Sequence, residues 1–201
     1  MMRRARIDHV LRAAAAVTGQ SRFVVIGSAA ILLRCRAIPA DMLMTPKVDL
    51  YAPDAPDIDA ASDAIEGAIG QGSSFHRKFG YHGDGVSPGT ARMPADWRER
   101  SAAVVGPGAP GVVAIVPEPD DLALSKLAAW RDKDRAWLAS GMRAGLFSPL
   151  RMAERLPLMP GPDAALGMVD AAELARRIRS AAAAGLRLAS LAEVAGGGPR
   201  P

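Results

Sequence analysis

The feature that most constrains the fold is a strand-like segment that runs into a glycine-serine turn. Residues 22–27, RFVVIG, form a short run rich in β-branched residues that closes on glycine, which indicates a buried strand. The next segment, SAAILLRC at residues 28–35, has the pattern of a helix. KVDLYAP, residues 47–53, alternates apolar and polar side chains before it ends at proline. The sequence therefore predicts a strand, a tight turn, a helix and a second strand in close succession.

The remaining elements follow from periodicity and from glycine and proline. Apolar residues recur at helical spacing over residues 4–17 and 57–70, and each run ends near glycine. Residues 73–105 mix aromatic and β-branched residues with glycine and proline, which favours one or two extended strands joined by a long loop. Residues 111–116, GVVAIV, predict a strand, and residues 117–147 predict a long helix that begins with proline and acids. Shorter helices separated by proline follow.

Strands followed by helices predict an α+β fold. We expect a mixed α/β core at residues 1–117, a helical part packed on that core at 118–195, and a disordered tail at 196–201. With 201 residues, 49% of them hydrophobic, the chain can bury a substantial core. No apolar run approaches the roughly 18 residues of a membrane helix, and the lone Cys35 cannot form an internal disulfide, so a cytoplasmic protein without membrane association is expected. The net charge of +4 suits an anionic partner such as a nucleotide or RNA.

Three segments, in the order IGSAAILL, TPKVDLYAP and DDLALSKLAAWRDKDRAWL, are similar to motifs of the nucleotidyltransferase superfamily. They resemble in particular the bacterial uncharacterised nucleotidyltransferase-like proteins related to toxins of abortive-infection toxin–antitoxin systems. Residues 73–100 resemble the middle of the same group, and the whole resemblance runs from about residue 20 to 150. It implies a nucleotidyltransferase-like fold, a nucleoside triphosphate and Mg²⁺ as ligands, and RNA or an antitoxin protein as a partner.

The resemblance assigns phosphate binding to Gly27 and Ser28. Glycine lets the backbone approach a phosphate closely, and the serine hydroxyl and the N–H groups at a helix N-terminus can donate to its oxygens. The alternative interpretation is that a buried strand needs a tight exit, which Gly-Ser-Ala also supplies.

The metal motif of the family is a threonine or serine, a spacer, and two acids one residue apart on a strand. Acids two positions apart share a face, so both can hold Mg²⁺. Thr45 and Asp49 match this motif, as nucleotide-binding and metal-binding residues respectively, but Lys47 stands where an acid belongs. An ammonium donates no lone pair to a metal and repels it, although it can bind phosphate directly. Asp84 is either the third carboxylate of the site or a turn residue between two glycines.

The resemblance also implies that Lys126 contacts nucleotide phosphates and that Asp134, in RDKD, completes the catalytic site. The alternative is a solvated cluster of charges on a helix surface. His76 and His82 lie on the segment interpreted as extended, and no further ligand completes a metal set with them. They are interpreted as loop or strand residues.

Two hypotheses follow. In the first, the protein transfers a nucleoside monophosphate from a nucleoside triphosphate to a hydroxyl of RNA or protein, with Asp49 binding Mg²⁺ and Asp134 supporting the acceptor. In the second, transfer is lost and the fold binds a nucleotide, RNA or a partner protein, with Lys47 supplying part of the charge of the missing ion. A scaffold with only an interaction role is the third alternative.

Overall fold

The computed structural model describes residues 1–163 and 169–196, with the side chains of residues 187–196 left out. The chain divides into two compact units. The first comprises Met1–Ala91 and Trp97–Glu118, and the second comprises Arg92–Asp96 and Pro119–Pro201. A mixed sheet in the first unit and helices in the second confirm the predicted α+β class. Of the predicted tail, Gly196 ends the last helix, and residues 197–201 lie outside the described part of the chain.

The first unit is built on a five-stranded mixed sheet. The strands are β1 (Arg22–Ile26), β2 (Lys47–Tyr51), β3 (His82–Gly85), β4 (Ala102–Val104) and β5 (Val113–Val116). Their order across the sheet is β3-β2-β1-β5-β4. β1 pairs antiparallel with β2 and parallel with β5, while β3 lies parallel to β2 at one edge and β4 antiparallel to β5 at the other. The apolar run from Phe23 to Ile26 is at most 2% exposed, as its central position requires.

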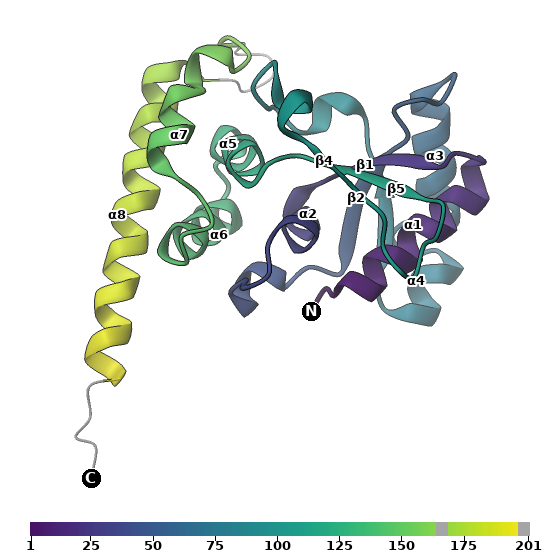
Figure 1. Ribbon diagram of the computed structural model, residues 1–201, viewed down its shortest axis with the longest axis horizontal. Coiled ribbons are helices and arrows are strands. Elements are labelled where there is room, and N and C mark those ends of the chain that lie inside the picture. The colour runs from purple at the N-terminus through teal and green to yellow at the C-terminus, as the bar shows by residue number, and fades with distance from the viewer. Residues whose placement is uncertain (164–168, 197–201) are drawn as a thin grey trace. The chain divides into compact units, whose positions relative to one another are not determined.

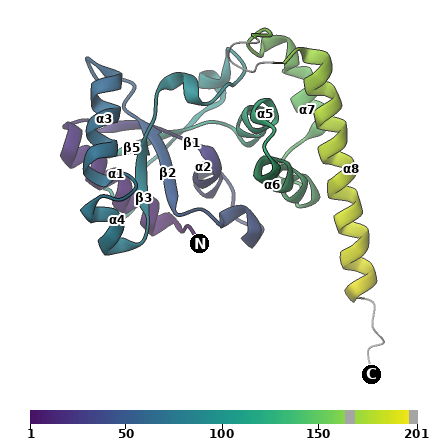
Figure 2. The same ribbon diagram turned by 180° about the vertical axis from the view of Figure 1, so that it is seen from behind.

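Helices cover both faces of this sheet. They are α1 (Arg4–Thr18), α2 (Gly27–Arg34), α3 (Ile58–Ile69) and α4 (Ser74–Phe79), with 3₁₀ turns η1 (Ala40–Leu43), η2 (Pro88–Thr90) and η3 (Trp97–Arg100). α1, α3 and α4 lie on one side and α2 on the other (Figures 1 and 2). α2 begins directly where β1 ends, which confirms the predicted strand–turn–helix unit.

The extended interpretation of residues 73–105 is wrong for its first part, which forms α4. The side chain of Ser73 caps this helix by accepting a hydrogen bond from the backbone N–H of His76 at 3.1 Å. Gly80 ends it in the left-handed conformation, with φ of 72°. His76 therefore lies on a helix, whereas His82 opens strand β3.

The second unit is helical in its described part. Its helices are α5 (Pro119–Ala129), α6 (Asp132–Arg143), α7 (Pro149–Glu154) and α8 (Ala171–Gly196), with a 3₁₀ turn η4 (Leu156–Leu158). α8 runs along α6 at close range, because a Cβ on Gly185 would lie 2.9 Å from the carbonyl oxygen of Ala139. No helix in the described ranges has the length and apolar character to cross a membrane.

The single helix predicted over residues 117–147 is wrong, because the chain breaks between α5 and α6 at Trp130. Trp130 has φ of 51°, a left-handed conformation that usually falls to glycine at a helix end. Its backbone N–H donates to the carbonyl of Lys126 at 2.8 Å. The guanidinium groups of Arg135 and Arg177 lie 5.8 and 5.3 Å from its ring centroid, and these contacts favour the strained conformation.

Candidate functional site

Gly27 stands at the junction of β1 and α2, where two constraints require glycine. Its φ is 71°, which other residues rarely adopt. A Cβ at this position would also lie 2.3 Å from Oδ2 of Asp49 on the neighbouring strand β2. In this structure, the absence of a side chain at Gly27 therefore leaves room for the carboxylate of Asp49. Ser28 follows on the first turn of α2, half-exposed, and the N-cap residue Ile26 supplies no capping hydrogen bond to that turn.

Two carboxylates lie side by side on neighbouring strands. Asp49 of β2 and Asp84 of β3 are register partners in the parallel pair. Their side chains are only 15% and 18% exposed. The interpretation of Asp84 as a turn residue is therefore wrong, and its place on a strand next to Asp49 fits the later-strand carboxylate that the resemblance calls for.

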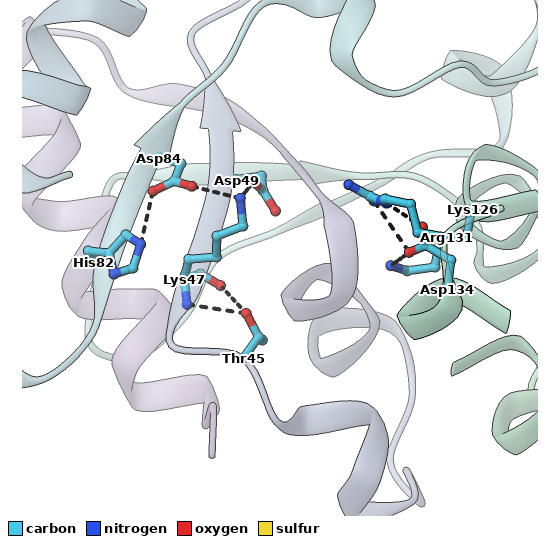
Figure 3. A network of polar contacts seen from close by, with 8 residues as sticks. All are labelled: Thr45, Lys47, Asp49, His82, Asp84, Lys126, Arg131 and Asp134. Carbon is cyan, nitrogen blue, oxygen red and sulfur yellow. Dashed lines mark hydrogen bonds and ion pairs between the residues drawn. The ribbon is translucent and has the colours of Figure 1, made fainter. Parts of the chain in front are cut away.

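The ammonium of Lys47 lies between these two carboxylates. Its Nζ is 2.7 Å from Oδ1 of Asp49 and 2.7 Å from Oδ2 of Asp84 (Figure 3). Burial by itself lowers the pKa of Lys47, but the hydrogen bonds and negative charges of Asp49 and Asp84 outweigh burial, and the pKa is raised. Lys47 is therefore a firmly held cation at neutral pH.

The oxygen atoms of Asp49 and Asp84 are of the kind that Mg²⁺ prefers, but the ammonium of Lys47 already contacts both side chains. A divalent ion between the carboxylates would meet a positive charge at short range, with no ligand in return. The donor set does not fit a divalent cation while Lys47 holds this position. Within the described ranges, no group of three or more His, Cys, Asp or Glu side chains is placed to hold a metal ion.

Thr45 fixes the backbone from which Lys47 extends. Its hydroxyl accepts from the backbone N–H of Lys47 at 3.2 Å and donates to the carbonyl of Lys47 at 3.4 Å. This local arrangement holds the start of β2 and gives Thr45 a structural role. Direct contact between Thr45 and a nucleotide stays a prediction.

Sequence reasoning interpreted His82 as a loop or strand residue, and it opens β3, but its position next to Asp84 was not predicted. The side chain of His82 is buried, and neither ring nitrogen has a hydrogen-bond partner among the described residues. Its Nε2 is nevertheless 3.1 Å from Oδ1 of Asp84, and its ring centroid is 4.5 Å from that of His76. We treat the contact with Asp84 as a close electrostatic approach, because its geometry is not that of a hydrogen bond. The position of His82 near Lys47 and Asp84 follows from the register of β2 and β3, which pairs Lys47 with His82 and which a single sequence does not show.

Burial, assisted by the positive charges of His76 and Lys47, lowers the pKa of His82 despite the opposing charges of Asp84 and Glu66. The unfolded chain, with the ordinary value of 6.5, therefore takes up a proton before the folded chain does. We expect the free energy of unfolding to fall as the pH drops below about 6.5, until the pH reaches the lower folded pKa. Urea unfolding at several pH values measures this loss.

The matched variant is His82→Asn, which has no titrating ring. Its loss of stability over the same pH range should be smaller than that of the parent chain. A residual loss is expected from His9, whose pKa is also lowered, first by burial and then by Arg12. Equal acid sensitivity of parent and His82→Asn would contradict the assignment.

A second charged cluster lies within the second unit. Oδ1 of Asp134 is 3.2 Å from Nζ of Lys126, and Oδ2 is 2.6 Å from Nε of Arg131 (Figure 3). Asp134 is fully buried and the side chain of Lys126 is 11% exposed, so the alternative of a solvated cluster is wrong for this pair. The ammonium of Lys126 also lies 4.7 Å from the ring centroid of Trp137.

The pKa of Asp134 reflects competing effects. Burial raises it, but the hydrogen bond from Arg131 and the charge of Lys126 outweigh burial, and the pKa is lowered. Asp134 is therefore an ionised, fully paired carboxylate. The arrangement gives Asp134 a clear role in holding Lys126 and Arg131, while a direct role of Lys126 or Asp134 toward a nucleotide stays a prediction.

The structure thus sorts the predicted site residues into two groups. The first unit brings Gly27, Thr45, Lys47 and Asp49 together and adds Asp84 to them. The second unit brings Lys126 and Asp134 together. Each group is held by its own contacts.

Comparison with known proteins adds one finding. A family model described as "Nucleotidyltransferase of unknown function (DUF6036)" matches residues 5–148, which is most of the chain. Neither the comparison with curated proteins nor that with solved structures returned a significant match. The match includes the turn at Gly27, the carboxylates of β2 and β3, and the helices that carry Lys126 and Asp134. The chain belongs to this nucleotidyltransferase family of unknown function.

Proposed function

We propose that this family member binds a nucleoside triphosphate without a divalent cation, and that it has lost metal-dependent transfer. The observation that carries this proposal is the ammonium of Lys47, 2.7 Å from both Asp49 and Asp84. It neutralises one of the two negative charges and takes the position that Mg²⁺ would need. Because the two carboxylates raise its pKa, loss of its proton does not free the position at neutral pH.

Phosphate would be bound by groups at the edge of this cluster. Lys47 donates to one oxygen on each carboxylate, and an ammonium has three N–H groups, so its third can face a phosphate oxygen. The side chain is 38% exposed, which allows that approach. Ser28 and the backbone N–H groups of the first turn of α2 would donate further, and the positive end of the α2 dipole offsets the remaining negative charge.

A second candidate is Mg²⁺-dependent transfer of a nucleoside monophosphate to a hydroxyl of RNA or protein. The in-register pair of Asp49 and Asp84 favours it, because two carboxylates from neighbouring strands suit a metal site. It requires Lys47 to leave both carboxylates when the metal–nucleotide complex arrives. A toxin–antitoxin role, with an antitoxin protein as partner, stays a prediction from the resemblance.

Thermal unfolding with each of the four nucleoside triphosphates, in EDTA and in excess Mg²⁺, separates the two candidates. We expect a rise in Tm that is the same in EDTA and in Mg²⁺, and no transfer of label from a triphosphate labelled at the α-phosphate. Arg36→Ala, which removes an exposed cation of the same unit, serves as the charge control and should keep the response. A response that needs Mg²⁺ together with label transfer would establish the second candidate, and no response under any condition would reject both.

A further inference from the structure

A cluster of aromatic rings and cations lies on the first unit outside the Lys47 site. The rings come from α1, from α4 and from the residue before β3, and cations surround them. We call this the aromatic–basic surface, and its members are His9, Phe75, Phe79, Tyr81, Arg6 and Lys78.

The rings pack tightly against each other. The ring centroid of His9 is 4.9 Å from that of Phe75 and 4.6 Å from that of Phe79, and Phe75 is 5.8 Å from Tyr81. Nδ1 of His9 is 2.8 Å from the hydroxyl of Tyr81, which fixes the orientation of both side chains. Phe79 remains 36% exposed at the rim. The cluster therefore presents a pre-ordered ring to solvent.

Cations lie over and beside these rings, and acids are missing from the same stretch of chain. The guanidinium of Arg6 is 5.0 Å from the ring centroid of Tyr81, and Nζ of Lys78 is 5.3 Å from that of Phe79. Arg77 of α4 is also exposed, but its guanidinium donates to the carbonyl of Gly72 and to the hydroxyl of Ser74, so we do not count it with the cations over the rings. Residues 67–83 contain no Asp or Glu. The acid of α1, Asp8, is 4% exposed and accepts a hydrogen bond from the backbone N–H of Gly108 at 3.0 Å.

We propose that the aromatic–basic surface binds a single-stranded polynucleotide. A strand offers two chemical groups in alternation: flat bases, which stack on an exposed ring, and phosphates, which pair with Arg and Lys. Phe79 would take a base, while Arg6 and Lys78 contact the flanking phosphates. A duplex keeps its bases stacked internally and leaves Phe79 without a partner. An acidic peptide would meet the cations but would leave the ring unused.

This surface is separate from the bound triphosphate of the proposed function and does not depend on it. β3 nevertheless connects the two places, since Tyr81 precedes the strand and Asp84 lies within it. The tilted contact between His76 of α4 and His82 of β3 provides a second connection. A strand held on the aromatic–basic surface would therefore lie on the same edge strand that carries the carboxylate of the Lys47 cluster.

Fluorescence anisotropy of the full chain with a labelled single-stranded oligonucleotide of about 12 nucleotides tests the proposal, with RNA and DNA as separate arms. The double variant Arg6→Ala/Lys78→Ala should weaken binding about tenfold and reduce the slope of log affinity against log salt by about 1.4. The matched control is Arg36→Ala/Arg179→Ala, which removes the same charge from exposed positions elsewhere and should keep the parental affinity.

The aromatic part is tested by Phe79→Ala, which should also lower the affinity about tenfold, while Phe79→Tyr should retain it. Thermal unfolding of each variant shows whether the fold is intact, and Phe79→Tyr keeps the test valid if Phe79→Ala unfolds. Binding of RNA alone, or of both RNA and DNA, would support the proposal. Binding of RNA alone would show that the surface requires ribose, and binding of both would show that it accepts either sugar. Equal losses in the two charge variants, equal binding of a duplex, or displacement of the strand by polyglutamate at similar concentration would overturn it.

Discussion

Replacing Lys47 with aspartate is expected to make the folded protein bind Mg²⁺. The variant removes the ammonium from between Asp49 and Asp84 and adds a third carboxylate on the same face of the sheet. Without metal, repulsion among the three carboxylates should lower the Tm below that of the parent. Mg²⁺ at about one hundred times its Kd should then stabilise the fold by about 2.7 kcal/mol, a rise of about 5–10 °C for a chain of this size.

The controls separate the loss of the cation from the gain of a ligand. Lys47→Met removes the charge without adding an oxygen, so its response to Mg²⁺ should be smaller than that of Lys47→Asp. Adding Asp84→Asn to Lys47→Asp should reduce the response again, because one of the three ligands loses its charge. If Mg²⁺ stabilises the parent chain as much as Lys47→Asp, the ammonium does not exclude the metal and the proposed function is wrong.

Asp134→Asn is expected to destabilise the second unit by about 3 kcal/mol. Asp134 is fully buried, and the substitution removes the negative charge that lies 3.2 Å from the ammonium of Lys126, itself 11% exposed. Arg131 is 60% exposed and can turn toward water, so the loss should lie near the lower end of what breaking a buried ion pair costs. Urea unfolding, followed by tryptophan fluorescence, measures the change.

Asp132→Asn is the matched control on the same helix. Asp132 is 93% exposed and pairs with Arg135 at the surface, so its substitution should change the free energy of unfolding by less than about 1 kcal/mol. The lowered pKa of Asp134 adds a second signature. Its contribution to stability is present above the ordinary value of 3.8 and is lost as the pH falls through the lower folded value, so the acid-induced loss should shrink in Asp134→Asn. Equal effects of both substitutions at neutral pH would contradict the role of Asp134.

Local sequence signals were sufficient to predict the central elements of the first unit. The β-branched run before Gly27 predicted β1, the Gly-Ser pair predicted the turn into α2, and alternation predicted β2 with Asp49 on one face. Each of these signals depends on neighbours within a few residues, which is why a single sequence reveals them. The two-residue spacing of Lys47 and Asp49 also placed both side chains on one face, where they now form an ion pair.

The place of Asp84 could not be predicted in the same way. Its partner Asp49 is 35 positions away in the chain, and the register between β2 and β3 is a property of the folded sheet. The flanking glycines suggested a turn, but Gly83 and Gly85 are needed for close packing. A Cβ on Gly83 would lie 2.8 Å from Val10, and one on Gly85 would lie 1.9 Å from the carbonyl oxygen of Ser62.

The break between α5 and α6 at Trp130 could not be predicted from the sequence for a different reason. A left-handed residue at a helix end is usually glycine, and its usual signal is therefore the glycine itself. Here tryptophan takes that conformation, and its ring contacts Arg177, which lies 47 positions further along the chain. The helical periodicity on both sides gave no sign of the interruption.

Because β3 is an edge strand, the contacts of Lys47 also help to hold β3 on the sheet. β3 is a four-residue strand at the edge of the sheet, and only β2 pairs with it among the described strands. The ammonium of Lys47 ties the two strands together through Asp84, in addition to their backbone hydrogen bonds. The ion pair between Lys47 and Asp84 therefore does two things: it sets the charge of the site, and it helps to hold the edge strand on the sheet. A ligand that draws Lys47 away from Asp84 would also weaken the attachment of β3 to β2. Ligand binding would thus change the stability of this edge strand.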